Sequence, residues 1–308
     1  MGIRDFLRDI GRGKHSARDL SRDDACALMG LVLDGFLSDL QMGAFCIAMR
    51  VKGETSDEMV GFLDAIESRI TRIQNPDPKP CVILPSYNGA RRLPLFTPLL
   101  AMLLAQKGLR VLIHGGNSES TRVSCEQVIK ALGWPCADQP ITLLTEPVTY
   151  VPLSLLCPGL WRLLQVRREI GLRNSGHSMA KLMNPVQGAC LQVASYTHPE
   201  YLAPMTQTLQ SRKAHAMLLR GTEGEPVADP RRPREASLLL AGQPWTTPDT
   251  APSVTEAWTA QPVHVSAEEN AALIHTMLKQ PDLVPPPIQR QVTLIAQLAL
   301  AIPPYSKP

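Results

Sequence analysis

Apolar residues recur at helical spacing in the first 70 residues of the chain, and capping signals precede them. Ser21, Ser38 and Thr55 begin the stretches SRDD, SDLQ and TSDE. In each, the hydroxyl can accept a hydrogen bond from a first-turn amide, and the third following side chain can return a bond. Apolar residues at intervals of three and four follow the second and third of these signals, namely Ala44, Ile47 and Ala48, then Met59, Phe62, Leu63 and Ile66. This pattern predicts a small all-helical unit.

After a proline-rich break at NPDPKP, residues 75–80, the periodicity changes. CVILP and LRVLIHGG are short apolar runs typical of buried strands, and LFTPLLAMLLAQKG and SCEQVIKALGW are typical of the helices between them. Further along the chain, CLQVAS and HAMLLRG have the same strand character. Strands that alternate with helices predict βαβ units and a mostly parallel sheet, with any binding site at the carboxyl ends of the strands.

Three further segments complete the pattern. Residues 158–185 return to a helical pattern that is rich in basic side chains. The stretch from Glu223 to about Val265 is rich in Pro, Thr and Arg, and we expect irregular edge structure or loop there. A capping box at Ser266 and the apolar run IQRQVTLIAQLALAI predict two closing helices.

Composition limits the classes of protein to consider. A chain of 308 residues with a hydrophobic fraction of 44% can bury a substantial core and suggests two domains. The net charge of +3 is too small to indicate a nucleic-acid partner without a clustered distribution. The seven cysteines lack CxxC spacing, so neither a zinc site nor a disulfide framework is indicated. The charged N-terminus has no apolar signal core, and we expect a cytoplasmic protein without a membrane partner.

Several segments resemble one family. Residues 20–66, which include LVLDGFLSDLQMGAFCIAMRVKGETSDEM, closely resemble anthranilate phosphoribosyltransferases, and so do VRREIGLRNSGHSMAKLMNP and SAEENAALIH. The resemblance covers nearly the whole chain and implies the α/β fold of glycosyltransferase family 3. That fold has a small all-helical domain, here residues 1–76 with 159–187, beside a larger α/β domain with a mostly parallel central sheet, here residues 77–158 with 188–308. It also implies a homodimer that forms through the helical domains.

The phosphate-binding motifs of this family are altered in the chain. The family's glycine-rich loop, which holds pyrophosphate after the first strand, keeps only Gly89, next to Asn88. The close backbone approach that successive glycines permit is therefore reduced. In the second motif His114, Gly115 and Asn117 remain, without the family's leading lysine and terminal arginine. We interpret these five residues as a residual phosphate pocket.

The magnesium motif of the family is also altered. Where the family has adjacent aspartate and glutamate, the stretch GTEGEP has Gly224 at the aspartate position. Glu225 remains as a candidate ligand, and Glu223 could substitute only with a shifted backbone. Magnesium that bridges diphosphate oxygens needs closely placed carboxylates. We therefore expect no metal, no cofactor and no catalytic residue, and magnesium would be needed only by an active transferase.

Positive charge is concentrated between Trp161 and Lys181. Five basic residues oppose the single Glu169 there, a local charge of +4, and they are Arg162, Arg167, Arg168, Arg173 and Lys181. The segment is either a solvated basic face or a track for phosphates. Arginine suits the second role because its planar guanidinium contacts a phosphate in two places and can stack on bases.

Two other pairs of residues have both a structural and a functional interpretation. Arg91 and Arg92 follow the glycine turn, and they are either surface side chains or an extension of an anion site at a helix N-terminus. His114 and His177 have no evident carboxylate partner in the sequence. Such histidines are more often structural than catalytic.

These departures, with the motifs PSYNGARR, RNSGH and THPEY, resemble the YbiB-like branch of the fold. The resemblance implies that the chain binds nucleic acid. The favoured hypothesis is a protein that binds DNA, largely independently of sequence, through a basic groove on a degenerate transferase scaffold. The alternative is an active glycosyl or phosphoribosyl transferase that uses phosphoribosyl diphosphate and magnesium.

Overall fold

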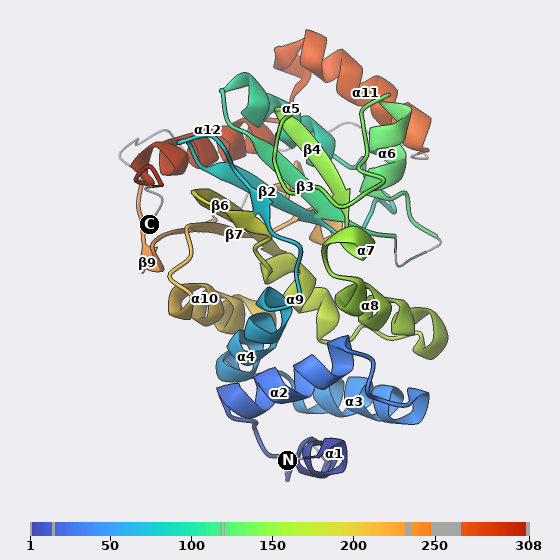
Figure 1. Ribbon diagram of the computed structural model, residues 1–308. Helices are drawn as coiled ribbons and strands as arrows, with labels where there is room; N and C mark the ends of the chain where they lie inside the picture. Colours follow the sequence, from blue (N-terminus) through green and yellow to red (C-terminus); the bar gives the residue numbers. More distant parts are fainter. Residues whose placement is uncertain are drawn as a thin grey trace.

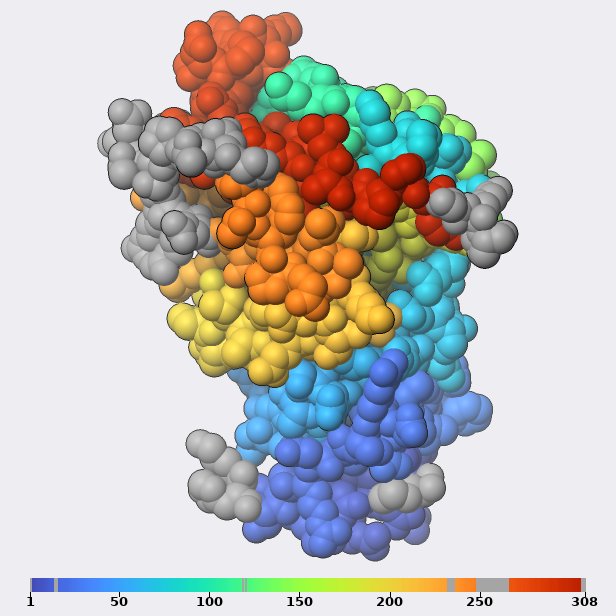
Figure 2. All heavy atoms as spheres, turned by 90° about the vertical axis from the view of Figure 1, so that its left-hand side faces the viewer, coloured from blue at the N-terminus to red at the C-terminus, as the bar shows by residue number. Residues whose placement is uncertain are grey.

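The computed structural model describes residues 2–13, 16–117, 119, 121–231, 236–247 and 266–305. It has a helical N-terminal domain and an α/β domain, as expected (Figure 1). In Figure 2 the N-terminal helices, in blue, form one end of the molecule and the C-terminal helices, in red, lie towards the other. No helix among these residues is both long enough and apolar enough to span a bilayer.

Four helices form the N-terminal part, and their bounds are α1 Ile3–Ile10, α2 Arg22–Leu33, α3 Asp39–Lys52 and α4 Ser56–Glu67. The reciprocal capping boxes predicted at Ser38 and Thr55 form. The box predicted at Ser21 is only half present. The Ser21 hydroxyl accepts a hydrogen bond from the Asp24 backbone amide. The Asp24 carboxylate, however, accepts a hydrogen bond from that same hydroxyl and not from the Ser21 backbone amide.

The predicted basic helical region is two helices, α8 Pro158–Ile170 and α9 Gly176–Leu182. Gly171 ends α8 in a left-handed conformation with φ of 71°, which glycine adopts without steric cost. Helix α8 packs on α2, and α9 packs on α4, so this later segment of the chain joins the N-terminal helices. The two parts of the chain are also tied by a short parallel pair, β1 Ile73–Gln74 with β5 Val186–Gln187.

The central sheet has seven strands in the order β4-β3-β2-β6-β7-β8-β9. The first five are parallel: β4 Val148–Pro152, β3 Val111–Gly115, β2 Cys81–Ser86, β6 Cys190–Tyr196 and β7 Ala216–Arg220. The last two, β8 Ser237–Leu240 and β9 Gln243–Pro244, are antiparallel. The expectation of irregular structure from Glu223 to Val265 was therefore wrong at β8 and β9, and residues 248–265 lie outside the described part. Strand β4 was not predicted.

The two faces of the sheet bury different sets of helices. Val82 and Leu84 of β2 point into a core shared with α5 Thr97–Gln106, α6 Cys125–Ala131, α11 Ala267–Lys279 and α12 Pro286–Ala301. The alternate residues Cys81 and Ile83 point into a second core, which is continuous with the helical domain and with α10 Leu202–Ser211. Each fully buried aliphatic side chain contributes about 1.5–3 kcal/mol, so this second core anchors the helical domain to the sheet.

The order in which strands are added to the sheet reverses between β2 and β6, although these two strands are parallel. From β2 the chain builds outward through β3 to β4, with α7 Leu153–Leu156 following, and then returns to place β6 beside β2 on the other side. In open parallel sheets, ligands bind in the crevice that such a reversal leaves at the carboxyl ends of the strands. The loops after β2, β3, β6 and β7 meet at this edge.

Candidate functional site

The turn that follows β2 is filled by a carboxylate of the chain. Glu225, only 2% exposed, lies in the loop after β7. Its Oε1 accepts hydrogen bonds from the backbone amides of Asn88 and Gly89, both at 2.8 Å. Its Oε2 accepts from the Thr97 hydroxyl at 2.9 Å and from the Ser86 hydroxyl. The amides that make this turn an anion site therefore already hold an anion.

Gly89 is required for this arrangement. Its φ is 69°, in the left-handed region, and a Cβ at this position would lie 2.7 Å from the carbonyl oxygen of Val123. The glycine retained in the sequence thus keeps the turn closed against the next loop.

Glu223 occupies the neighbouring amides. Its carboxylate accepts hydrogen bonds from the backbone N–H groups of Arg91 at 2.7 Å and Arg92 at 3.2 Å. The side chains of these two arginines are exposed at the rim. Among the residues that the structure describes, no group of three or more His, Cys, Asp or Glu side chains could hold a metal ion. Glu223 and Glu225, the candidate metal ligands, are thus bonded to backbone amides of the loop after β2.

The loop after β3 closes the other side of the turn. His114 is fully buried, its Nδ1 is hydrogen-bonded to the Tyr87 hydroxyl at 2.6 Å, and burial lowers its pKa to about 3. Gly115 packs so closely that a Cβ there would lie 2.3 Å from the Ser86 carbonyl oxygen. Asn117 accepts the Glu119 amide at 3.0 Å. The five residues of the predicted phosphate pocket therefore come together, and the cavity beside them is only about 10 Å³. That is the size of about one water molecule.

Three arginines surround the carboxylate of Glu119. Arg122 and Arg173 contact it at 3.0 Å, and Arg167 forms a third ion pair with it. Burial acts to raise the pKa of Glu119, but the hydrogen bond from Arg173 and the charges of Arg122 and Arg167 outweigh burial and lower it. The carboxylate is therefore ionised at neutral pH, and three positive charges against one negative leave the cluster at +2. We call these four residues the Glu119 cluster.

The predicted basic track divides in the structure. Arg168 donates to the carbonyl of Asn117 at 2.9 Å and so lies beside the Glu119 cluster, which contains Arg167 and Arg173. Arg162 donates instead to the carbonyl of Leu33 at 2.6 Å, at the end of α2. It lies on the same helix but is directed to the helical domain.

Lys181 does not lie on a solvent-facing track, contrary to its place in the predicted set. It is only 8% exposed, and its Nζ donates to the carbonyl of Gly224 at 2.7 Å and is 3.4 Å from Ser195 Oγ. Burial, with a smaller effect of Arg173, lowers its pKa to about 7. Helix α9 is short and buried on most sides, so the charge that seemed exposed in the sequence points inward.

The low pKa of Lys181 makes stability depend on pH. Because the unfolded side chain titrates near 10.4 and the folded one near 7, the unfolded state binds more protons between these values. We therefore expect stability to rise as the pH increases from about 7 to about 10. The Lys181→Met variant should show a smaller rise over this range in urea unfolding, and an unchanged pH dependence in this variant would contradict the assignment.

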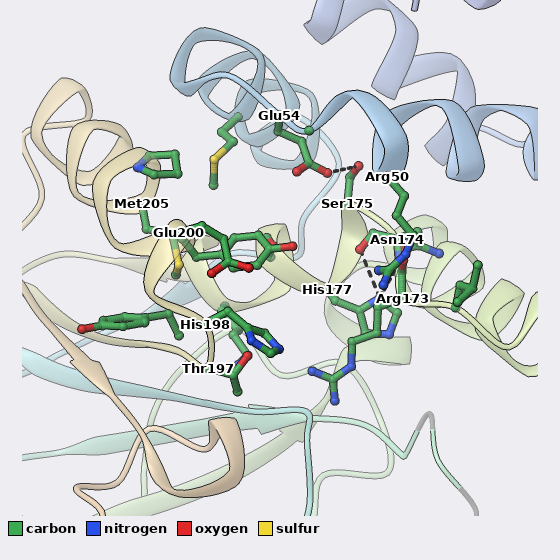
Figure 3. A pocket seen from close by; sticks show the side chains of 18 of the residues that line it. Arg50, Glu54, Arg173, Asn174, Ser175, His177, Thr197, His198, Glu200 and Met205 are labelled. Atoms are coloured by element: carbon green, nitrogen blue, oxygen red, sulfur yellow. Dashed lines mark hydrogen bonds between the residues drawn. The ribbon is translucent and has the colours of Figure 1, made fainter. Parts of the chain in front are cut away.

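A second, larger cavity lies between the helical domain and the carboxyl end of β6. Its volume is about 770 Å³, and side chains from three regions line it (Figure 3). Arg50 comes from the last turn of α3, and Glu54 comes from the loop between α3 and α4. Arg167 comes from α8, His177 from α9, and Arg173 from the segment between these two helices. The chain after β6 supplies Thr197, His198, Glu200, Tyr201 and Met205.

The sequence did not indicate Glu119, Arg122, Arg50 or the large cavity. Glu119 and Arg122 lie in a polar run that follows the glycine turn after β3, which marks a loop but no partner. Arg50 lies in the last turn of α3 and would be assigned to a solvated face. Its position became evident only because its Nη1 donates to the Arg173 carbonyl at 3.1 Å, across 123 positions of the chain.

Comparison with known proteins places this geometry in context. Residues 4–69 match the helical bundle domain of the glycosyl transferase family. The uncharacterized protein YbiB of Escherichia coli strain K12 is 39% identical over 246 residues, which cover 78% of this chain and 77% of that protein. The anthranilate phosphoribosyltransferase of Symbiobacterium thermophilum is 29% identical over 233 residues, which cover 71% of this chain and 64% of that enzyme.

Two solved structures share the fold over nearly all of the chain. Anthranilate phosphoribosyltransferase from Thermus thermophilus superposes with a TM-score of 0.70 at 19% identity, over 98% of this chain and 88% of the other. The Saccharomyces cerevisiae enzyme in complex with PRPP and Mg superposes with a TM-score of 0.71 at 14% identity, over 97% and 89%. At these identities the likeness establishes the fold alone.

Proposed function

The chain belongs to the anthranilate phosphoribosyltransferase-like family, together with YbiB of Escherichia coli, and on that premise we propose that it is a nucleic-acid-binding protein. It binds DNA, largely independently of sequence, through the basic side chains at the edge of the sheet. The observation that carries this proposal is the +2 charge of the Glu119 cluster, with Arg168 beside it, on a scaffold whose own phosphate loop is occupied.

The Glu119 cluster suits a polymer of phosphates. The side chains of Arg167 and Arg173 are 20% and 29% exposed, so their positions are defined but remain open to a ligand. Each guanidinium has five N–H donors, and the side-chain bonds within the described chain use one of them in each case. Binding a phosphate to such groups releases counterions, and this release gives salt-sensitive affinity without reading of bases.

The exposed arginines Arg91 and Arg92 extend the same edge. Their backbone amides are bonded to Glu223, and their side chains are directed outward. Glu223 takes up the anion-binding capacity of the amides, so any further anion at this position would be held by the guanidinium groups alone. This favours a long polyanion that contacts the guanidinium groups at the surface over a small diphosphate that is buried in the turn.

Salt dependence tests this function directly. We expect fluorescence anisotropy with a labelled DNA duplex to show binding that weakens by about 100-fold between about 50 mM and about 200 mM salt, if about four phosphates are contacted. Affinity that is weak and insensitive to salt would contradict the proposal. Changing the sequence of the duplex at fixed length should leave the affinity within about threefold, because phosphate contacts carry no sequence information.

The transferase alternative makes the opposite prediction for a small ligand. Phosphoribosyl diphosphate needs the amides of Asn88 and Gly89, which Glu225 occupies, and space for two phosphates, where the cavity is about 10 Å³. We therefore expect calorimetry with this ligand and magnesium to give no binding. Micromolar binding that requires magnesium would favour the transferase.

We also propose that the chain forms a homodimer through its helical domain. Leu40, Ile47 and Val51 on one face of α3 are 85%, 41% and 52% exposed, and Phe36 just before the helix is 67% exposed. Phe36, Leu40, Ala44, Ile47 and Val51 are separated by four, four, three and four residues, so they form one stripe. The apolar periodicity seen at Ala44 and Ile47 thus belongs to the outward face of α3, whereas Phe45, Cys46 and Met49 face the core. An apolar stripe of this kind is typical of an interface.

A charge placed in this stripe tests the dimer. The Ile47→Asp variant should lower the mass in solution from twice 33.7 kDa to 33.7 kDa in light scattering, because burying an unpaired carboxylate in an apolar interface costs several kcal/mol. Leu300→Asp is the matched control, since Leu300 is 86% exposed on α12, outside the helical domain. A wild-type mass of 33.7 kDa, or a dimer that survives Ile47→Asp and is lost in Leu300→Asp, would contradict this interface.

A further inference from the structure

The large cavity has room for a small organic ligand, unlike the closed phosphate turn. Its volume of about 770 Å³ falls within the range of about 300–1,000 Å³ that small-molecule sites occupy. It opens beside the Glu119 cluster, because Arg167 and Arg173 belong to both. Whatever binds in the cavity can therefore be continuous with a phosphate chain held by the cluster.

One end of the cavity is cationic. Arg50, Arg167 and Arg173 converge there from α3, α8 and the segment between α8 and α9. Arg50 is held in place by its bond to the Arg173 carbonyl at 3.1 Å, and each of the three guanidinium groups makes one side-chain hydrogen bond within the described chain. The remaining N–H donors match the oxygens of a phosphate.

The opposite end is apolar and aromatic. Met59, Tyr201, Pro204 and Met205 line it, and Figure 3 shows Met205 across the cavity from Arg173. A planar ring can stack on tyrosine and contact thioether sulfur favourably. An isolated phosphate would leave this end unfilled.

Hydrogen-bond acceptors lie between the two ends. Glu54, whose carboxylate accepts the Ser175 hydroxyl, projects into the cavity from above in Figure 3, and Glu200 lies opposite it. His177 is 6% exposed, and its buried Nε2 has no hydrogen-bond partner among the residues that the structure describes. An unpaired buried nitrogen costs free energy, which a hydrogen bond with a ligand would recover. Carboxylates placed over an aromatic end suit a ring that carries an amino group.

We propose that this cavity binds one nucleotide unit with an unpaired base, its phosphate at the arginine end and its base at the Tyr201–Met205 end. Glu54 and Glu200 accept hydrogen bonds from the exocyclic amino group of the base, so cytosine and adenine are preferred to uracil. Bases inside a duplex are stacked and paired, so only a single strand or a strand end can insert one. The link to a polymer rests on the proposed function, but the binding of a free mononucleotide does not.

Calorimetry of the full chain with CMP, UMP and inorganic phosphate tests the cavity alone. We expect CMP to bind at least about tenfold more tightly than inorganic phosphate, because a stacked base strengthens binding by about this factor or more. CMP should also bind more tightly than UMP. Phosphate that binds as tightly as CMP, or no binding of CMP, would overturn the nucleotide site, and equal binding of CMP and UMP would overturn the role of the two glutamates.

Two variants connect the cavity with the polymer. Thr197→Trp fills the cavity from a half-buried loop position, and Tyr201→Ala removes the stacking surface without adding volume. Each variant should bind CMP and a single-stranded oligonucleotide about tenfold more weakly than the wild type does. Its affinity for duplex DNA should be unchanged. Leu300→Trp, far out on the surface of α12, should change none of these.

The outcomes separate this proposal from the proposed function. If no DNA binds but CMP binds and Thr197→Trp abolishes it, the nucleotide site stands and the DNA function fails. If DNA binds and the variants weaken the binding of single strands and of duplexes equally, the nucleotide site fails and the DNA function stands. The same conclusion follows if the variants weaken the binding of neither. Unfolding curves for each variant confirm that a loss of binding is not a loss of fold.

Discussion

Replacing Arg167 and Arg173 together by alanine is expected to weaken DNA binding by about 10- to 100-fold and to reduce the slope of log affinity against log salt by about 2. Both side chains contact Glu119, so their removal takes the Glu119 cluster from +2 to 0, with Arg122 and Glu119 left. The loss is therefore larger than the loss of two arginines from an unconnected basic surface. Anisotropy titrations at several salt concentrations measure both quantities.

Stability should change little in this double variant. Partly exposed ion pairs contribute about 1 kcal/mol or less, so the unfolding midpoint in urea should remain near that of the wild type. Arg4→Ala with Arg8→Ala is the matched control, because both residues are exposed on α1 and their removal takes the same charge from the chain. If this control weakens DNA binding as much as the first variant does, net charge and not the cluster governs the affinity.

The Glu119→Gln variant gives a change of opposite sign at the same position. Glu119 competes with a phosphate for three guanidinium groups, and glutamine keeps the shape of the side chain while removing its charge. DNA affinity should rise by several-fold and the salt slope should become steeper. An affinity unchanged by this substitution would show that phosphates do not approach the cluster.

Replacing Glu225 by alanine is expected to destabilise the fold by about 3–5 kcal/mol. The buried carboxylate accepts hydrogen bonds from two backbone amides and two hydroxyls, and its removal leaves these donors without their partner at the centre of the site. Backbone amides cannot turn away to find another acceptor, so Asn88 and Gly89 carry most of the loss.

Urea or thermal unfolding measures this loss against two comparisons. Glu225→Gln keeps one carbonyl acceptor, so its free energy of unfolding should fall by less than that of the alanine variant. Glu146→Ala removes an exposed glutamate and should stay within about 0.5 kcal/mol of the wild type. A Glu225→Ala protein as stable as the wild type would mean that water or another anion replaces the carboxylate at no cost, and the loop would then be an open anion site.

Much of the architecture followed from local patterns. Capping at Ser38, Thr55 and Ser266 and the apolar runs of β2, β3, β6 and β7 depend on residues within one or two turns of each other, so the sequence predicted them. Strand β4 and the edge strands β8 and β9 were missed, because short strands at or near the margin of a sheet owe their conformation to neighbours that are distant in the chain.

The residues of the site were found more readily than their roles. The glycine turn at Asn88 and Gly89 and the arginines of α8 have local signatures, and the structure brings Arg167, Arg168 and Arg173 to the loop after β3. Lys181 was misplaced because its helix pattern did not reveal that α9 is enclosed by β6 and the loop after β7. Charge density along a sequence reports nothing about burial.

The linear pattern thus indicated most of the helices and four strands of the central sheet, the kind of fold, and a phosphate turn with surplus arginines. It did not indicate the partners of those groups. Glu225 reaches a turn that lies 136 and 137 positions earlier, and Arg173 reaches Glu119 across 54 positions. Such pairings arise because the strand order reverses between β2 and β6, and this brings loops from distant parts of the chain together at one edge of the sheet. No spacing along the chain encodes these contacts.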